Sequence, residues 1–205
     1  MCREGFLIGG FASITFYYKP LQWWLAREGF SVEFIRPGPL TLNVWPLDRF
    51  FEIARPVLEK APDPVFIIGH SLGGIQAIML ADMFPKIKKV FTVGTPVWGC
   101  SVKMYEDAIR ALLIVPDELW DRFHNEIIPR QASKVVTISC KDDLLAPQEK
   151  CVIEGASANY VLQTDEVGAS SSHLLLPYLT STVKIITDEI KAIPVEDTPL
   201  VLQPA

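Results

Sequence analysis

The fold of this 205-residue chain is decided by one stretch of its sequence, Val65-Phe66-Ile67-Ile68-Gly69-His70-Ser71-Leu72-Gly73-Gly74. The first four residues are all apolar, which predicts a strand buried on both faces, as in a parallel sheet covered by helices. The residues from Leu72 to Phe84 are apolar nearly all round and precede Pro85, so we expect a buried helix that ends there. Ser71 must then lie on a sharp turn between the strand and the helix.

Short apolar runs and helical patterns alternate along the rest of the chain. Besides residues 65–68, the expected strands are Gly5–Gly9, Ser31–Ile35, Lys89–Val93, Val135–Cys140 and Asn159–Gln163. Apolar residues recur at helical spacing within residues 20–29 and 47–58, and in a last helix that ends before Pro194. This alternation predicts one α/β domain over residues 1–193, a doubly wound, mostly parallel six-stranded sheet flanked by helices. The proline-rich residues 194–205 predict an extended C-terminal tail.

Residues 101–130 depart from the alternation. They hold two helical stretches broken at Pro116, with no strand between them, and are apolar for a connection. This helical insertion either covers an edge of the sheet or caps a site at the strand ends, and the sequence leaves both alternatives open.

The composition excludes several classes of function. The formal net charge is -5 and no basic stripe is present, so we expect no nucleic-acid partner. The long apolar region at residues 64–83 contains glycines and polar side chains, so we expect no transmembrane segment. No signal peptide pattern is visible, which predicts a cytoplasmic protein, or a secreted one if a signal was removed. The sequence gives no indication of the oligomeric state.

The four cysteines form no Cys-x-x-Cys pair, so we expect neither a metal site nor thioredoxin-like chemistry. Cys140 and Cys151 flank a short polar loop. They would form a disulfide in an oxidising compartment and otherwise remain free buried thiols.

Ser71 is the candidate nucleophile. Gly69 and Gly73, two residues before and two after it, leave room for the strand and the helix to pass closely while the serine oxygen projects above the sheet. The helix N-terminus beneath the serine would stabilise a developing negative charge. Because a serine alcohol is a poor nucleophile alone, it needs a base within hydrogen-bond reach and an acid that orients the base.

The chain contains three histidines as candidate bases. His70 lies on the turn itself and is interpreted as a packing residue that points away, and His124 is interpreted as a solvated side chain of the insertion. His173 follows a run of small residues after the last expected strand, where a histidine has few packing reasons to occur. We therefore expect His173 to be the base.

The acid is expected just beyond the strand at residues 135–140. Asp142 and Asp143 lie there, between the nucleophile and the base in the chain order Ser, Asp, His. Asp165 and Glu166 compete with them, because they lie nearer to His173 in the sequence.

Taken together, these residues make the chain resemble the lipase and esterase branch of the α/β-hydrolase superfamily, in its minimal small-lipase form, from Phe6 to the final helix. The Asp-x-x-x-Pro pattern of that family falls on Asp143 and Pro147, which selects Asp143 as the acid. The resemblance implies a catalytic triad of Ser71, Asp143 and His173.

The turn after the first strand also carries the resemblance. The His-Gly-Phe turn of the family is matched by Gly9-Gly10-Phe11, with Gly9 in place of the histidine. This implies that the backbone N–H groups of Phe11 and Leu72 form an oxyanion hole. The turn Gly94-Thr95-Pro96 resembles one common in triacylglycerol lipases, whereas the following residues and the missing N-terminal β-hairpin depart from larger members.

The resemblance implies a carboxylesterase or lipase that needs no cofactor and acts on a small-molecule ester or a lipid. An acyltransferase or an amidase would use the same triad, and a non-catalytic binding member of the fold is a further alternative. Trp98 and Leu174 flank the predicted site and suggest an apolar acyl pocket, although ordinary rim packing explains them equally well.

Overall fold

The computed structural model describes residues 3–36, 43–63, 65–113, 115–163 and 172–193. Within these residues six strands form one sheet in which every neighbouring pair is parallel. The order across the sheet is β2-β1-β3-β4-β5-β6. The strands are β1 (Arg3–Ile8), β2 (Phe30–Phe34), β3 (Val65–His70), β4 (Ile87–Val93), β5 (Val135–Cys140) and β6 (Ala158–Leu162). The predicted fold class is confirmed, and the sheet is wholly rather than mostly parallel.

The predicted strands are all present, and their ends differ from the prediction by at most two residues. The strand β3 continues to His70, two residues beyond the prediction, because Gly69 and His70 still pair with β4. The strand β4 begins at Ile87, two residues early, because Ile87 still pairs with Val65 of β3.

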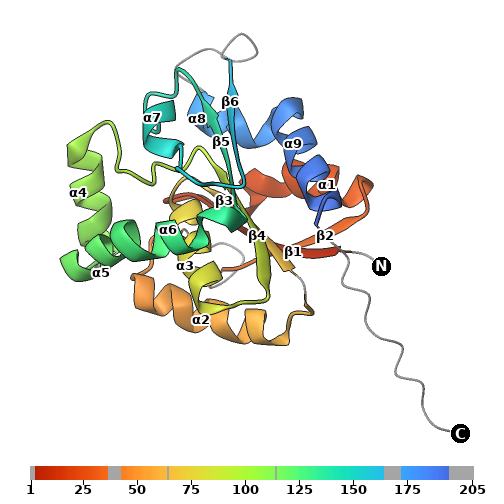
Figure 1. The fold of residues 1–205 in the computed structure, drawn as a ribbon, viewed down its shortest axis with the longest axis horizontal. Coiled ribbons are helices and arrows are strands. Elements are labelled where there is room, and N and C mark those ends of the chain that lie inside the picture. The colour runs from red at the N-terminus through yellow and green to blue at the C-terminus, as the bar shows by residue number, and fades with distance from the viewer. Residues whose placement is uncertain (1–2, 37–42, 64, 114, 164–171, 194–205) are drawn as a thin grey trace, which may run out of the picture.

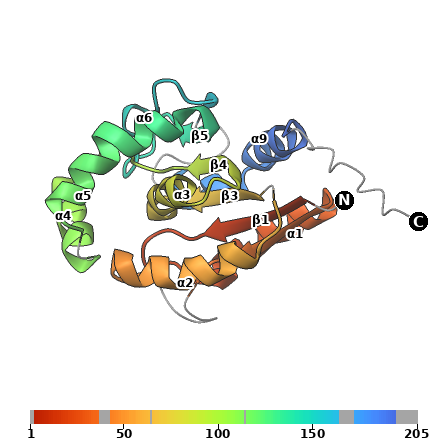
Figure 2. The same cartoon turned by 60° about the horizontal axis from the view of Figure 1, so that its bottom comes forward.

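Helices cover both faces of the sheet, as Figures 1 and 2 show. Helices α1 (Lys19–Arg27) and α9 (Thr180–Lys191) lie side by side on one face, and α2 (Leu47–Lys60) and α3 (Leu72–Met83) cover the other. Successive residues of a strand therefore enter opposite cores: Leu7 packs on the α1 side, whereas Phe6 and Ile8 pack on the α3 side. The remaining helical segments are η1 (Thr15–Tyr18), α4 (Lys103–Leu112), α5 (Asp117–Arg122), η2 (Phe123–Ile127), α6 (Ile128–Gln131), η3 (Ala132–Lys134), α7 (Gln148–Cys151), α8 (Ser172–Leu175) and η6 (Leu176–Tyr178).

Helix α3 lies unusually close to the sheet at its N-terminal end. A Cβ atom on Gly69 would lie 2.3 Å from the carbonyl oxygen of Gly73, and one on Gly73 would lie 2.3 Å from the carbonyl oxygen of Ile8. Only residues without a Cβ allow this approach. It brings the start of α3 to the carboxyl ends of β1 and β3, where the sheet order reverses direction.

The two halves of the helical insertion have different surroundings. Its second half packs on the sheet, because Phe123, Ile127 and Ile128 are buried in the same core cluster as α3. Its first half lies beside Ser71, because Ile109 of α4 and Trp120 of α5 line a pocket there.

Cys100, Cys140 and Cys151 are free thiols, so the disulfide alternative for Cys140 and Cys151 is wrong.

In the described part of the chain no helix is long and apolar enough to cross a membrane. The predicted tail, residues 194–205, lies outside the described residues.

Candidate active site

Ser71 lies at the turn between β3 and α3 in a backbone conformation that few residues adopt. Its φ is 52° and its ψ is -125°, and it is one of two described non-glycine residues with positive φ. Such a conformation costs of order 1–3 kcal/mol for a residue with a Cβ, so the surrounding structure must hold it in place. The Ser71 N–H donates to the carbonyl of Val93 at 2.9 Å, which fixes the turn to the end of β4.

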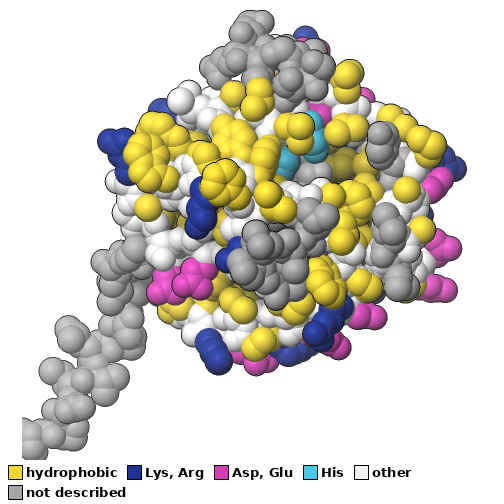
Figure 3. Space-filling view, turned by 180° about the vertical axis from the view of Figure 1, so that it is seen from behind, with side chains coloured by type: hydrophobic (Ala, Val, Ile, Leu, Met, Phe, Trp, Pro, Cys, Tyr) yellow, Lys and Arg dark blue, Asp and Glu magenta, His cyan; other side chains and the backbone are white. Residues whose placement is uncertain are grey.

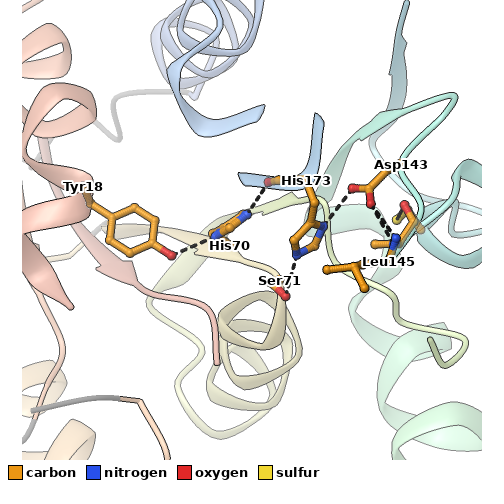
Figure 4. A network of polar contacts seen from close by, with 8 residues as sticks. Tyr18, His70, Ser71, Asp143, Leu145 and His173 are labelled. Carbon is orange, nitrogen blue, oxygen red and sulfur yellow. Dashed lines mark hydrogen bonds and ion pairs between the residues drawn. The ribbon is translucent and has the colours of Figure 1, made fainter. Parts of the chain in front are cut away.

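Ser71, His173 and Asp143 form a line of hydrogen bonds (Figure 4). Ser71 follows β3, Asp143 follows β5, and His173 lies near the start of α8. The Ser71 Oγ lies 3.1 Å from the His173 Nε2, and the His173 Nδ1 lies 2.8 Å from the Asp143 Oδ2. The structure therefore brings together the three side chains that the sequence predicted as nucleophile, base and acid.

Asp143 rather than Asp142 faces the histidine. The Asp143 side chain is buried, and its second carboxylate oxygen accepts the N–H groups of Leu145 and Ala146, both at 2.9 Å. Asp142 is exposed. Asp165 and Glu166 lie outside the described residues. A carboxylate with both oxygens bonded in this way has one fixed orientation, which in turn fixes the imidazole of His173.

His173 lies on a short helix, α8, whereas the sequence predicted a loop. His173 is buried, with 10% of its side-chain surface exposed. Gly94 lies directly beneath it: a Cβ at that position would lie 3.4 Å from the His173 Nδ1 and 3.6 Å from the Asp143 Oδ2. Gly94 also has a φ of 55°, so both its backbone conformation and its neighbours favour glycine.

The turn after β1 lies against the nucleophile, since a Cβ on Gly10 would lie 3.1 Å from the Ser71 Cβ. Phe11, the next residue, lines one pocket together with Ser71. The Leu72 N–H is the first of helix α3 and has no intrahelical acceptor. Among the described residues, no hydrogen-bond partner occupies the Phe11 N–H. The assignment of these two N–H groups as oxyanion donors stays a prediction.

A second set of polar contacts lies behind the serine, and sequence reasoning missed it. The Gly10 N–H donates to the Tyr18 Oη at 2.7 Å, and that hydroxyl lies 2.8 Å from the His70 Nδ1. The His70 Nε2 lies 3.0 Å from the carbonyl oxygen of His173. Because a carbonyl only accepts, His70 carries its proton on Nε2 and accepts the Tyr18 hydroxyl at Nδ1. His70 is therefore not merely a packing residue: it links the turn after β1 to the helix that carries His173 (Figure 4).

Burial keeps this second set uncharged. Burial, together with the nearby His173, lowers the pKa of His70 from 6.5 to about 3. Burial raises the pKa of Tyr18 to about 12. Both groups are neutral near pH 7, so the direction of each hydrogen bond is fixed. No local sequence signal identifies the pair, because Tyr18 and His70 are 52 residues apart.

Two pockets meet at Ser71. The inner pocket, of about 50 Å³, lies beneath α4 and is lined mainly by Leu72, Ile75, Met79, Ile109, Leu113 and Trp120. The outer pocket, of about 500 Å³, opens on the other side and is lined by residues that include Phe11, Ile14, Tyr17, Leu145, His173 and Leu174. Figure 3 shows histidine side chains in a hollow rimmed by hydrophobic side chains. The two predicted substrate contacts differ: Leu174 lines the outer pocket, whereas Trp98 lines neither.

Trp98 packs instead against His124, which was expected to be a solvated side chain. Its ring stacks on that of His124 with 5.4 Å between the centroids, and its Nε1 donates to the carbonyl of Val152 at 2.7 Å. The two ring nitrogens of His124 lie 2.9 and 2.7 Å from the carbonyl oxygens of Trp120 and Val97. His124 therefore connects the insertion to the segment after β4, and its interpretation as a solvated side chain is wrong.

Two tryptophans of α1 lie on the surface. Trp23 and Trp24 are 53% and 41% exposed, and the guanidinium of Arg27 lies over both rings. They lie far along the chain from the site and contribute to neither pocket. No cluster of metal-ligating side chains occurs among the residues that the structure describes.

Comparisons with known proteins give matches in structure only. No protein-family model matches the sequence, and no curated protein sequence does. A monoacylglycerol lipase from Paleococcus ferrophilus has a similar structure, with a TM-score of 0.59 and 16% identity over 90% of this chain and 94% of that one. A metagenomic carboxyl esterase gives a TM-score of 0.64 with 13% identity, over 91% of this chain and 74% of its own. An alpha/beta hydrolase from a lagoon-sediment metagenome gives a TM-score of 0.64 with 16% identity, over 93% and 91%.

Proposed function

The chain has the α/β-hydrolase fold, and on that premise we propose that it is a serine hydrolase that cleaves carboxylic ester bonds through a covalent acyl-enzyme. One observation carries the proposal. The Ser71 Oγ, at a strained strand-to-helix turn, lies 3.1 Å from the Nε2 of a histidine whose other nitrogen contacts a buried carboxylate at 2.8 Å.

The first step is attack of Ser71 on the ester carbonyl carbon. As the new C–O bond forms, His173 Nε2 takes the hydroxyl proton and becomes an imidazolium. The electron pair of the carbonyl bond moves to its oxygen. The buried carboxylate of Asp143 stabilises the imidazolium and holds the ring with Nε2 directed at Ser71.

The oxygen that becomes negative is stabilised by the Phe11 and Leu72 N–H groups. Both belong to rigid backbone, because Phe11 follows a turn anchored through Gly10 to Tyr18, and Leu72 begins a fully packed helix. Preorganised donors of this kind cost no reorganisation during the reaction, and removing one typically lowers kcat by about 10²–10³-fold.

Collapse of the tetrahedral intermediate breaks the bond to the alcohol, and His173 Nε2 returns the proton to the leaving oxygen. A water molecule then attacks the acyl-enzyme with the same histidine as base, which releases the carboxylic acid and restores Ser71. Two structural neighbours, a monoacylglycerol lipase and a carboxyl esterase, support an ester as the substrate.

The proposal is tested with p-nitrophenyl acetate and p-nitrophenyl butanoate. The purified chain is expected to hydrolyse both, and Ser71→Ala is expected to lower kcat by at least about 10⁴-fold. The matched control is Ser157→Ala, since Ser157 is an exposed serine outside both pockets. Wild-type turnover in Ser71→Ala would contradict the assignment of the nucleophile, and the absence of turnover in the wild type would contradict ester hydrolysis.

A further inference from the structure

Resting on the ester hydrolysis proposed above, we propose that the substrate class of this site is an ester joining a short acyl group to a larger apolar alcohol. The unequal size of the two pockets at Ser71, and the position of His173 relative to them, carry the proposal.

The attacked carbon lies where the two pockets meet. Ser71, Pro96, Cys100 and Ile109 line both pockets, so a carbonyl carbon bonded to the Ser71 Oγ has open space on two sides. With its oxygen directed at the Phe11 and Leu72 N–H groups, the carbon has two remaining substituents, the acyl chain and the leaving alcohol. One substituent must therefore enter each pocket.

The position of His173 decides which substituent enters which pocket. The leaving oxygen must receive its proton from the His173 Nε2, so it must lie on the side of that nitrogen. His173 lines the outer pocket and does not line the inner one. The alcohol therefore occupies the outer pocket, and the acyl chain enters the inner pocket.

The volume of the inner pocket limits the acyl chain. It measures about 50 Å³. Since a dry cavity of about 150 Å³ holds a benzene molecule and about 10–15 Å³ holds one water molecule, the inner pocket holds roughly two to four carbon atoms. Acyl groups up to about pentanoyl fit with the carbonyl carbon at Ser71. Longer chains exceed the volume of this pocket.

The inner pocket is lined mainly by uncharged side chains. Of the two charged residues in its lining, Arg110 pairs with Asp117, and its guanidinium lies over the ring of Trp120 at 5.3 Å. The carboxylate of Glu106 accepts the N–H of Cys100 at 3.1 Å. The Arg110 Nε is buried and has no hydrogen-bond partner among the described residues. Because the rest of the lining is mainly aliphatic or aromatic, we expect an uncharged acyl chain.

The outer pocket fits a larger apolar alcohol. Its volume of about 500 Å³ lies within the range of pockets that enclose small organic ligands. Ile14 and Leu174 are 40% and 57% exposed, and both line this pocket. Exposed apolar side chains beside a pocket gain from covering by an apolar ligand.

Two series of esters test the proposal. The first uses p-nitrophenyl esters from acetyl to dodecanoyl, with kcat/KM as the readout. We expect kcat/KM to rise by about fourfold for each CH₂ that fits, to peak at or below pentanoyl, and to fall at least tenfold by octanoyl. The second compares cyclohexylmethyl acetate with ethyl acetate, whose alcohols are similarly acidic. Here we expect at least a tenfold preference for the larger alcohol.

Variants on the two sides of Ser71 test the assignment of each pocket. Met79→Ala and, independently, Trp120→Leu enlarge only the inner pocket, and at least one of them should move the acyl optimum by two or more carbons. Met79→Leu conserves volume and should leave the optimum where it is. Leu174→Ala changes only the outer pocket, so it should reduce the preference for cyclohexylmethyl acetate and leave the acyl optimum in place.

The outcomes separate this proposal from the proposed function. Loss of p-nitrophenyl acetate turnover in Ser71→Ala establishes the hydrolase, whichever esters are preferred. If that holds and kcat/KM rises through octanoyl, or if ethyl acetate is the better acetate, the assignment of the pockets is overturned. An acyl optimum that moves in Leu174→Ala and in neither inner-pocket variant overturns it as well.

Discussion

Replacing Tyr18 by phenylalanine removes one hydroxyl and keeps the buried ring, so it isolates the contacts behind the nucleophile. That hydroxyl accepts the Gly10 N–H at 2.7 Å and donates to the His70 Nδ1 at 2.8 Å. Both partners are buried, and neither gains another acceptor or donor in the variant. Because leaving one buried polar group unsatisfied costs about 1–3 kcal/mol, we expect the free energy of unfolding to fall by at least about 2 kcal/mol.

The same substitution should slow catalysis. Gly10 precedes Phe11, the expected oxyanion donor, and the Tyr18 hydroxyl is the acceptor that holds the Gly10 N–H. A loosened donor stabilises the transition state less than a fixed one, while the substitution keeps the Tyr18 ring that lines the outer pocket. We therefore expect kcat to fall by about tenfold to 10²-fold, less than the 10²–10³-fold for a donor that is lost entirely, with KM changed less than threefold.

Urea denaturation measures the first effect, and steady-state hydrolysis of p-nitrophenyl acetate, at a temperature where the variant is folded, measures the second. Tyr160→Phe is the matched control, because the Tyr160 hydroxyl donates to Glu189 at 2.9 Å, away from both pockets. A Tyr18→Phe variant with unchanged unfolding free energy would refute the burial argument. A destabilised variant with unchanged kcat would show that the network supports the fold and not the oxyanion turn.

Three further predictions follow from individual contacts. Asp143→Asn keeps the shape of the side chain but stabilises the wrong histidine tautomer, so kcat should fall by about 10⁴-fold in a protein whose circular dichroism spectrum is unchanged. The pKa of His70 is 6.5 in the unfolded chain and about 3 in the folded chain. The contribution of His70 to the free energy of unfolding is therefore fully present above pH 6.5 and falls by about 1.4 kcal/mol for each pH unit below it. Between pH 7 and pH 5 the free energy of unfolding, measured by urea denaturation, should fall by about 2 kcal/mol more in the wild type than in His70→Asn. Equal decreases in the two proteins would contradict a buried neutral imidazole. Gly69→Ala would place a Cβ 2.3 Å from the Gly73 carbonyl oxygen, so the variant should fail to fold, and a well-folded protein with wild-type thermal stability would show that α3 can move away.

The sequence predicted the parts of the fold that depend on local patterning. Alternating strands and helices predicted the sheet, and the chain order of Ser71, Asp143 and His173 predicted three side chains that the structure places in contact. This works because the carboxyl ends of parallel strands share one edge of the sheet, so residues just beyond those ends are brought together. The choice of Asp143 over Asp142 rested on a family pattern, and burial of Asp143 agrees with it.

Contacts between distant segments could not be predicted in the same way. Tyr18 has the pattern of an apolar residue before a helix, and His70 that of a turn residue. Only the tertiary packing of η1, which ends at Tyr18, brings their polar atoms together. Trp98 follows the strand β4 closely enough to suggest a substrate contact. Its ring instead stacks on His124, a residue of the insertion whose position no pattern specified. The sizes of the two pockets depend on where α4 lies, which is also a property of packing.

The central claim is that Ser71 is the nucleophile that forms the acyl-enzyme. Reaction of the wild-type chain with a fluorophosphonate, followed by peptide mapping by mass spectrometry, tests it most directly. We expect one stable adduct per chain on the peptide that contains Ser71, formed in parallel with loss of esterase activity and slowed by substrate. An adduct on another residue, or full activity in a chain completely labelled at Ser71, would contradict the claim.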